Sequence, residues 1–130
     1  MAGYTKVNLK TDVQDMAPQF GFAPDMEARF ARTPLDGETL GLSLITLAPG
    51  FRIPFGHKHA NQEEVYVVVR GSGRVKVEDE IVDLRAWDAV RFDKGTMRQV
   101  EAGPDGIEYI AFGAGDDPMD AEMAPGWWSD

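Results

Sequence analysis

The chain is 130 residues long, which suits one domain over residues 1–130 with a single hydrophobic core. It has no cysteine, and this excludes a disulfide framework, a cysteine-ligated zinc site and a thiol nucleophile. Its formal net charge of -9 argues against a nucleic-acid partner, because phosphate binding needs a concentrated basic surface. No apolar run approaches the ~20 residues that cross a bilayer, and the first residues lack the apolar core of a secretory signal. We therefore expect a cytoplasmic protein with no membrane partner.

Strand patterns dominate the chain. Residues 12–20 have room for one helical turn. Residues 27–32 are compatible with a helix or a strand, and the alternation of Met26, Ala28 and Phe30 favours the strand. Further on, β-branched and aromatic residues recur in short runs between turns, which predicts strands over residues 39–47, 64–70, 88–92, 97–101 and 107–112 and a hairpin over residues 74–84. This spacing, without a long amphipathic helix, indicates an all-β sandwich or barrel. The residues predicted to be largely buried are Leu40, Leu42, Val75, Val77, Ile81, Val90 and Ile110.

The end of the chain carries two adjacent tryptophans, Trp127 and Trp128, after an acidic, turn-rich segment. Two neighbouring indole rings are costly to leave in water. We therefore expect the tail to fold back, either onto its own barrel or onto a second subunit. The second arrangement would make the protein a homodimer.

Both histidines of the chain, His57 and His59, stand two residues apart. In an extended strand, side chains at this spacing point to the same face. Glu64 follows after a turn that resets the alternation, and Tyr66 shares its face. If Glu64 points inward with the imidazoles, three ligands converge, and two histidines with one carboxylate suit a divalent transition metal with open positions. The spacing alone leaves an alternative, in which solvated loop histidines lie beside an exposed carboxylate.

The order of Gly50, the His57-Lys58-His59 triplet, Glu64 and Gly71 resembles the first motif of the cupins. Residues 87–98 resemble the second motif, and the similarity covers about residues 39–112. It implies a double-stranded β-helix, or jelly-roll barrel, with the N-terminal strands and the C-terminal tail packed on this core. It also implies an internal pocket and iron, manganese, nickel or zinc as the candidate metal. Asp93 replaces the usual proline of the second motif, and this is a mild departure within a turn.

Arg98 is the larger departure, because it stands where cupins have a fourth metal ligand, a histidine. A guanidinium has no lone pair for a metal, so the set of three histidines and one glutamate is excluded. Two arrangements stay open. In one, His57, His59 and Glu64 hold a metal while Arg98 binds an anionic substrate beside Tyr66. In the other, the site is metal-free, and the histidines and Arg98 bind an anion directly.

Three functions are compatible with this reasoning. The first is a small-molecule-binding cupin that works as a mononuclear metal-dependent enzyme on a small anionic organic substrate. The second is a non-catalytic, metal-free barrel that binds or senses a ligand, and the third is an oligomerisation module. Fold does not choose among them, since one barrel hosts many functions.

Overall fold

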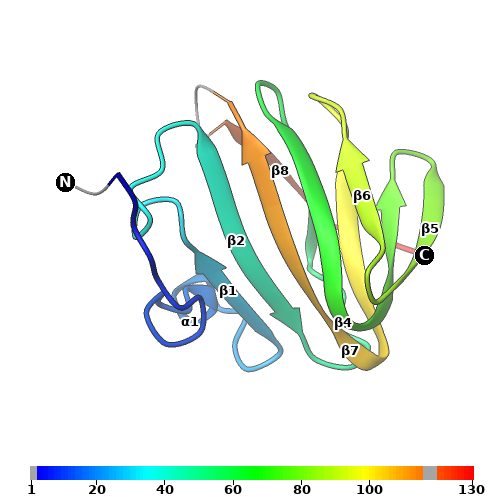
Figure 1. The fold of residues 1–130 in the computed structure, drawn as a ribbon. Helices are drawn as coiled ribbons and strands as arrows, with labels where there is room; N and C mark the ends of the chain where they lie inside the picture. Colours follow the sequence, from blue (N-terminus) through cyan, green and yellow to red (C-terminus); the bar gives the residue numbers. More distant parts are fainter. Residues whose placement is uncertain (1–2, 116–119) are drawn as a thin grey trace.

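An antiparallel sheet that curls on itself makes up most of the molecule (Figure 1). The structure is a computed structural model that describes residues 3–115 and 120–130. Among these residues, the chain forms one short helix and eight strands. Their bounds are α1 Ala17–Phe20, β1 Met26–Phe30, β2 Leu40–Leu47, β3 Phe55–His59, β4 Glu63–Val77, β5 Glu80–Arg85, β6 Ala89–Phe92, β7 Arg98–Ala114 and β8 Ala121–Pro125.

The strands form two layers of a barrel. The pairing order runs β1-β2-β7-β3-β8, and β4 pairs with β5, β6 and β7. In Figure 1, strands β1, β2, β7, β4 and β6 lie in the front layer, with β3 and β8 behind them. The all-β, double-stranded β-helix predicted from the sequence is therefore confirmed. None of the helices in the described part of the chain is long and apolar enough to cross a membrane.

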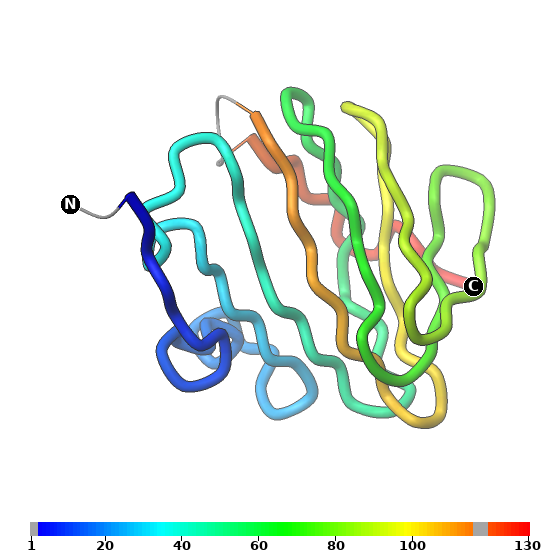
Figure 2. The backbone as a smooth tube through the Cα atoms, in the orientation of Figure 1, coloured from blue at the N-terminus to red at the C-terminus, as the bar shows by residue number. Residues whose placement is uncertain are grey.

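β4 and β7 are longer than the sequence predicted. Breaks were expected at Gly71 to Gly73 and at residues 103–106, but each strand continues through its glycines, and the pairing register shifts there instead. Such bulges bend a strand sharply, which lets β4 and β7 pass from one layer to the other (Figure 2). Gly71 shows why glycine is needed: its φ is 79°, and a Cβ atom would lie 2.1 Å from the carbonyl oxygen of Gly106.

The interior of the barrel is filled by alternate side chains of the long strands, such as Tyr66 and Val68 of β4. Of the seven residues predicted to be buried, Val75 is fully buried, and four are half-buried (Leu42, Val77, Val90 and Ile110). The prediction is wrong for Leu40 and Ile81, which are 66% and 49% exposed. Leu40 begins β2, and Ile81 belongs to β5, which pairs with β4 alone. Alternation shows which residues share a face, but it does not show which face is covered.

The C-terminal tail packs on the barrel of its own chain. β8 pairs with β3 over its whole length, and a Cβ atom on Gly56 of β3 would lie 2.8 Å from the ring of Trp127. Trp128 is 4% exposed, with the Arg52 guanidinium 4.0 Å from the centroid of its ring. Its backbone N–H donates to Gln99 Oε1 over 3.0 Å. The two tryptophans are thus covered within a single chain.

Candidate functional site

Three strands bring the predicted site residues together. His57 and His59 lie on β3, Glu64 is the second residue of β4, and Arg98 begins β7 as the register partner of His57. The short turn between β3 and β4 changes the alternation, so Glu64 faces the two imidazoles. Each side chain is thus positioned by a paired strand, which is a more rigid support than a loop.

The two imidazoles and the Glu64 carboxylate converge. One potential ligand atom from each of the three residues lies within 4.8 Å of the other two. Glu64 Oε1 is 3.9 Å from His57 Nε2 and 3.8 Å from His59 Nε2. The side chains of His57, His59 and Glu64 are 23%, 11% and 14% exposed, so the cluster lies at the edge of the interior with limited access to water. This geometry differs from the alternative expectation, in which solvated loop histidines lie beside an exposed carboxylate.

Arg98 closes the inner side of the cluster. Its side chain is 1% exposed, and Nη2 forms an ion pair with Glu64 Oε1. Nη1 donates to the Thr96 carbonyl over 3.0 Å, and Nε donates to the Tyr66 hydroxyl over 3.4 Å. The guanidinium carbon lies 4.7 Å from the centroid of the Phe92 ring. A buried guanidinium is costly unless it is paired, so Glu64 is the group that neutralises Arg98.

Burial and the neighbouring positive charge keep His57 neutral. Burial, together with the positive charge of Arg98 and the neighbouring His59, lowers the pKa of His57 to about 3. Burial and the charge of Glu64 raise the pKa of Tyr66, so its phenol keeps its proton; the hydroxyl lies 3.5 Å from His57 Nε2. At neutral pH, therefore, His57 is an uncharged imidazole and adds no second positive charge beside Arg98.

Asp120 is a site residue that sequence reasoning missed. Its Oδ1 lies 2.7 Å from His59 Nδ1, and its Oδ2 accepts the Asn61 backbone N–H over 2.6 Å. Burial alone would raise the pKa of Asp120, but the hydrogen bonds from His59, Asn61 and Gln62 lower it. An ionised carboxylate only accepts hydrogen bonds, so Nδ1 of His59 carries the proton and Nε2 is directed at Glu64. Asp120 lies 61 residues from His59, and no sequence pattern predicted that β8 would pair with β3.

The donor set fits a divalent transition metal. Two imidazole nitrogens and one carboxylate oxygen are ligands that iron, manganese, nickel and zinc accept. Metal-binding histidines usually donate their second ring N–H to a carboxylate or a carbonyl, and Asp120 is such a partner for Nδ1 of His59. Two ligands of one ion stand at most about 4.2 Å apart. The three ligand atoms therefore need only small side-chain rotations to share an ion. Arg98 opposes metal binding, because its guanidinium pairs with Glu64 and so competes with a metal ion for that carboxylate.

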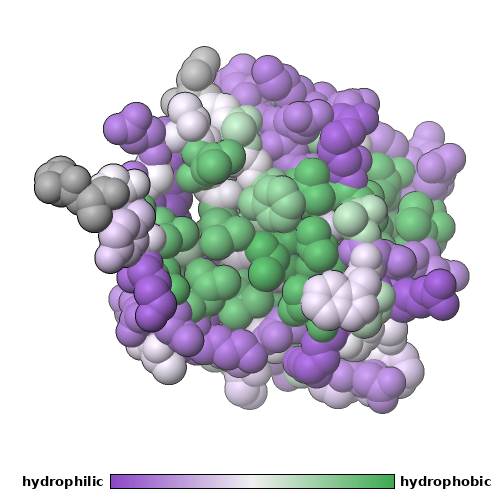
Figure 3. All heavy atoms as spheres, viewed as in Figure 1, coloured by the Kyte–Doolittle hydropathy of each residue, from purple (hydrophilic) through white to green (hydrophobic). Residues whose placement is uncertain are grey.

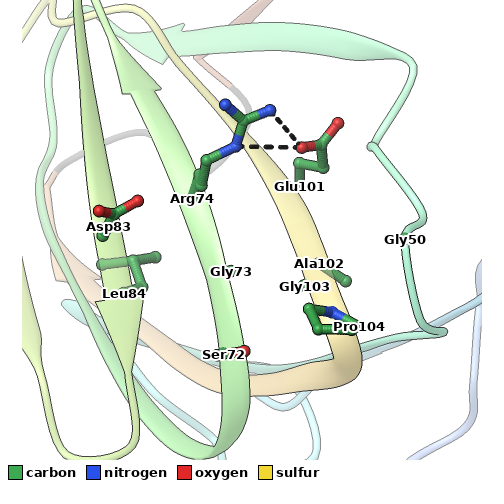
Figure 4. Close-up of a pocket in the computed structure, with 10 residues that line it drawn as sticks. All are labelled: Gly50, Ser72, Gly73, Arg74, Asp83, Leu84, Glu101, Ala102, Gly103 and Pro104. Atoms are coloured by element: carbon green, nitrogen blue, oxygen red, sulfur yellow. Dashed lines mark hydrogen bonds and ion pairs between the residues drawn. The ribbon is translucent and has the colours of Figure 1, made fainter.

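A surface groove of about 490 Å³ lies elsewhere, between β4, β5 and the middle of β7 (Figure 4). It is lined mainly by glycines and small side chains of these strands. Its arginine, Arg74, is already paired with Glu101, with Nη2 2.6 Å from Oε1. The groove shares no residue with the histidine cluster.

Comparison with known proteins agrees with the motifs. The family described as the cupin domain matches residues 43–107. A cupin protein of Bacteroides fragilis has a TM-score of 0.72 and 22% identity, covering 92% of this chain and 90% of its own. KdgF of Halomonas sp. has a TM-score of 0.64 and 22% identity, covering 85% and 94%.

The fold also recurs inside a larger protein. Oxalate decarboxylase of Bacillus subtilis has a TM-score of 0.67 and 24% identity over 76% of this chain, which corresponds to only 28% of that protein. None of the curated proteins compared with this chain matches it. At these identities, the solved structures establish the shared fold and nothing about activity.

Proposed function

The chain belongs to the cupin domain family, and from that premise we propose that it binds a small anionic organic molecule at a divalent transition metal. The metal ligands are His57, His59 and Glu64, and Arg98 is the group that binds the anion. The observation that carries this proposal is the convergence of three ligand atoms within 4.8 Å beside one buried guanidinium. That combination supports a single site that binds both a metal and an anion.

Each side chain has a distinct task in this proposal. His57 presents a neutral imidazole, and Asp120 holds the ring of His59 in place. Tyr66 and Thr96 fix the orientation of Arg98. A carboxylate is recognised well by the planar fork of a guanidinium. When bound, the metal would supply Lewis-acid chemistry and open positions for a ligand.

Arg98 couples the two binding events. In the structure, its Nη2 is paired with Glu64, the one charged ligand of the proposed metal site. An incoming anion that takes over this pairing releases Glu64 for the metal. The anion also neutralises a guanidinium that would otherwise repel the cation. Metal and anion should therefore strengthen one another's binding, because such coupling is reciprocal.

A titration of the untagged protein with Mn²⁺ tests this function. We expect about tenfold tighter binding of the metal in sodium acetate than in sodium chloride of the same ionic strength. Arg98→Met should bind Mn²⁺ equally in both salts, whereas Arg85→Met, at an exposed position of β5, should keep the difference. Equal affinities in the two salts for the parent protein would refute the coupling.

A second function is favoured by the same ion pair. Glu64 and Arg98 neutralise each other without a metal, and His57 is neutral, so the site is also complete as a metal-free anion binder. This is the ligand-binding or sensing barrel. It predicts that acetate binds with unchanged affinity in the presence of a chelator and that Mn²⁺ gives no saturable binding.

A further inference from the structure

Two buried phenols face the interior of the barrel from the front layer. Figure 3 shows that hydrophobic residues occupy the centre of the outer face of this layer. On its inner face, Tyr66 of β4 and Tyr109 of β7 are 4% and 3% exposed. Their ring centroids lie 4.8 Å apart, with an angle of 33° between the ring planes. Since the Tyr66 hydroxyl contacts Arg98 and His57, Tyr109 lies one ring away from the proposed site.

The hydroxyl of Tyr109 has no hydrogen-bond partner among residues 3–115 and 120–130. A buried phenol usually has one, because an unpaired polar group is costly in an apolar interior. In the same part of the chain, Trp128 Nε1 is the one buried side-chain polar atom that is both unpartnered and sealed from solvent. The Tyr109 hydroxyl is therefore not sealed, and it borders space that water can reach.

Tyr109 and the ion pair of the site face the same part of the interior. In the sheet register, Ala111 is the partner of both Ser43 and Tyr66, so small side chains stand beside the Tyr66 ring. Burial, and then Tyr66 and the Glu64 carboxylate, raise the pKa of Tyr109 well above its ordinary value. At neutral pH the phenol thus keeps its proton and can donate a hydrogen bond to a ligand.

The surroundings of Tyr109 suit an uncharged acceptor. Its register partners are Ile45 and Val68, which carry no charge, and the positive charge that acts on it is that of Arg98. If Arg98 binds one carboxylate, a second carboxylate beside Tyr109 would be buried without a counter-ion. A ligand hydroxyl would add a donor that needs an acceptor of its own. A keto oxygen only accepts, and it brings no charge.

We propose that the ligand is a short oxo acid, a monocarboxylate with a keto oxygen, and that the Tyr109 hydroxyl donates a hydrogen bond to this oxygen. The inference rests on the proposed function, in which Arg98 binds the carboxylate. Tyr66 lies between the two donors, with its hydroxyl on Arg98 and its ring against Tyr109. A carboxylate without the keto oxygen would leave the Tyr109 hydroxyl unpaired in a filled site, and this cost makes the site selective.

Calorimetric titration of the untagged protein at a fixed Mn²⁺ concentration, with two matched pairs of ligands, tests the role of Tyr109. Pyruvate has a keto oxygen on its second carbon that propionate lacks, and levulinate has one on its fourth carbon that pentanoate lacks. In the parent, the oxo acid of at least one pair should bind about tenfold tighter than its counterpart. Tyr109→Phe should remove this preference, whereas Tyr4→Phe, at a 78% exposed position, should keep it.

The outcomes separate the role of Tyr109 from the function on which it rests. Loss of the preference in Tyr109→Phe, with propionate and pentanoate still bound, supports the proposal. Equal binding within both pairs by the parent overturns it, and so does a preference that persists in Tyr109→Phe, which would come from the metal or from another side chain. If the parent binds none of the four carboxylates, the proposed function fails together with this inference.

Urea denaturation distinguishes a binding role of the hydroxyl from a structural one. Because the Tyr109 hydroxyl is unpartnered in the described part of the chain, Tyr109→Phe should leave the denaturation midpoint unchanged or raise it. Tyr66→Phe removes a hydroxyl that accepts a hydrogen bond from Arg98, and it should lower the midpoint. A lower midpoint for Tyr109→Phe would show that its hydroxyl makes a structural hydrogen bond, and the proposal would be wrong.

Discussion

Glu64→Ala will lower the unfolding free energy by about 3–5 kcal/mol in the presence of a chelator. The cause is Arg98, whose side chain is 1% exposed and has Glu64 as its ion-pair partner. Without that carboxylate, the guanidinium keeps one carbonyl and one hydroxyl as acceptors for Nη1 and Nε, while Nη2 loses its partner and the charge is left uncompensated. Urea denaturation followed by circular dichroism measures the loss, with an unchanged m-value as the check on two-state behaviour.

The double variant Glu64→Ala/Arg98→Met is the control for this interpretation. It removes both charges and replaces the guanidinium with a flexible apolar side chain, so most of the stability should return. The two single variants and the double variant form a cycle that isolates the ion pair. A double variant that loses the sum of the two single effects would show that the pair contributes nothing and that Glu64 acts through packing alone.

Arg98→His will raise the affinity for a divalent metal by about 100-fold or more. A guanidinium about 5 Å from a divalent cation repels it by about 6–7 kcal/mol at an effective dielectric near 20, and Glu64 offsets part of this. Histidine removes the charge and adds a nitrogen ligand. Since Arg98 also contributes to the lowered pKa of His57, that pKa should rise from about 3. Calorimetric titration with Mn²⁺ measures the affinity, and nuclear magnetic resonance titration measures the pKa.

Arg85→His is the matched control, because it removes one positive charge at an exposed position of β5. It should leave the metal affinity unchanged. If Arg98→His binds metal no more tightly than the parent, Arg98 does not occupy the position of a fourth ligand, and the description of the pocket is wrong.

The sequence predicted the parts of this structure that depend on local spacing. The alternation of β-branched residues predicted the strands, and the His57-Lys58-His59 triplet with Glu64 predicted that these three side chains converge. These predictions succeeded because side chains two residues apart on a strand share a face. The pairing of Glu64 with Arg98 was also expected, since a buried arginine needs a negative partner.

Predictions from the sequence were missing or wrong where a residue's contacts depend on segments far away in the chain. Asp120 reaches His59 through the pairing of β8 with β3, and two strands of five residues each carry no sequence signal for such pairing. The exposure of Leu40 and Ile81 depends on which face of each strand the other layer covers. The alternation of residues along a strand does not predict this. The length of β4 and β7 was missed because glycines that end one strand can also form a bulge in another.

The central claim is that His57, His59 and Glu64 together hold one divalent metal ion. Calorimetric titration of the untagged protein with Mn²⁺, with His59→Ala measured alongside, tests this claim most directly. We predict saturation at about one ion per chain for the parent and no saturable binding for His59→Ala, because removing one of three ligands leaves too few donors. No saturable binding by the parent, or equal binding by His59→Ala, would contradict the claim.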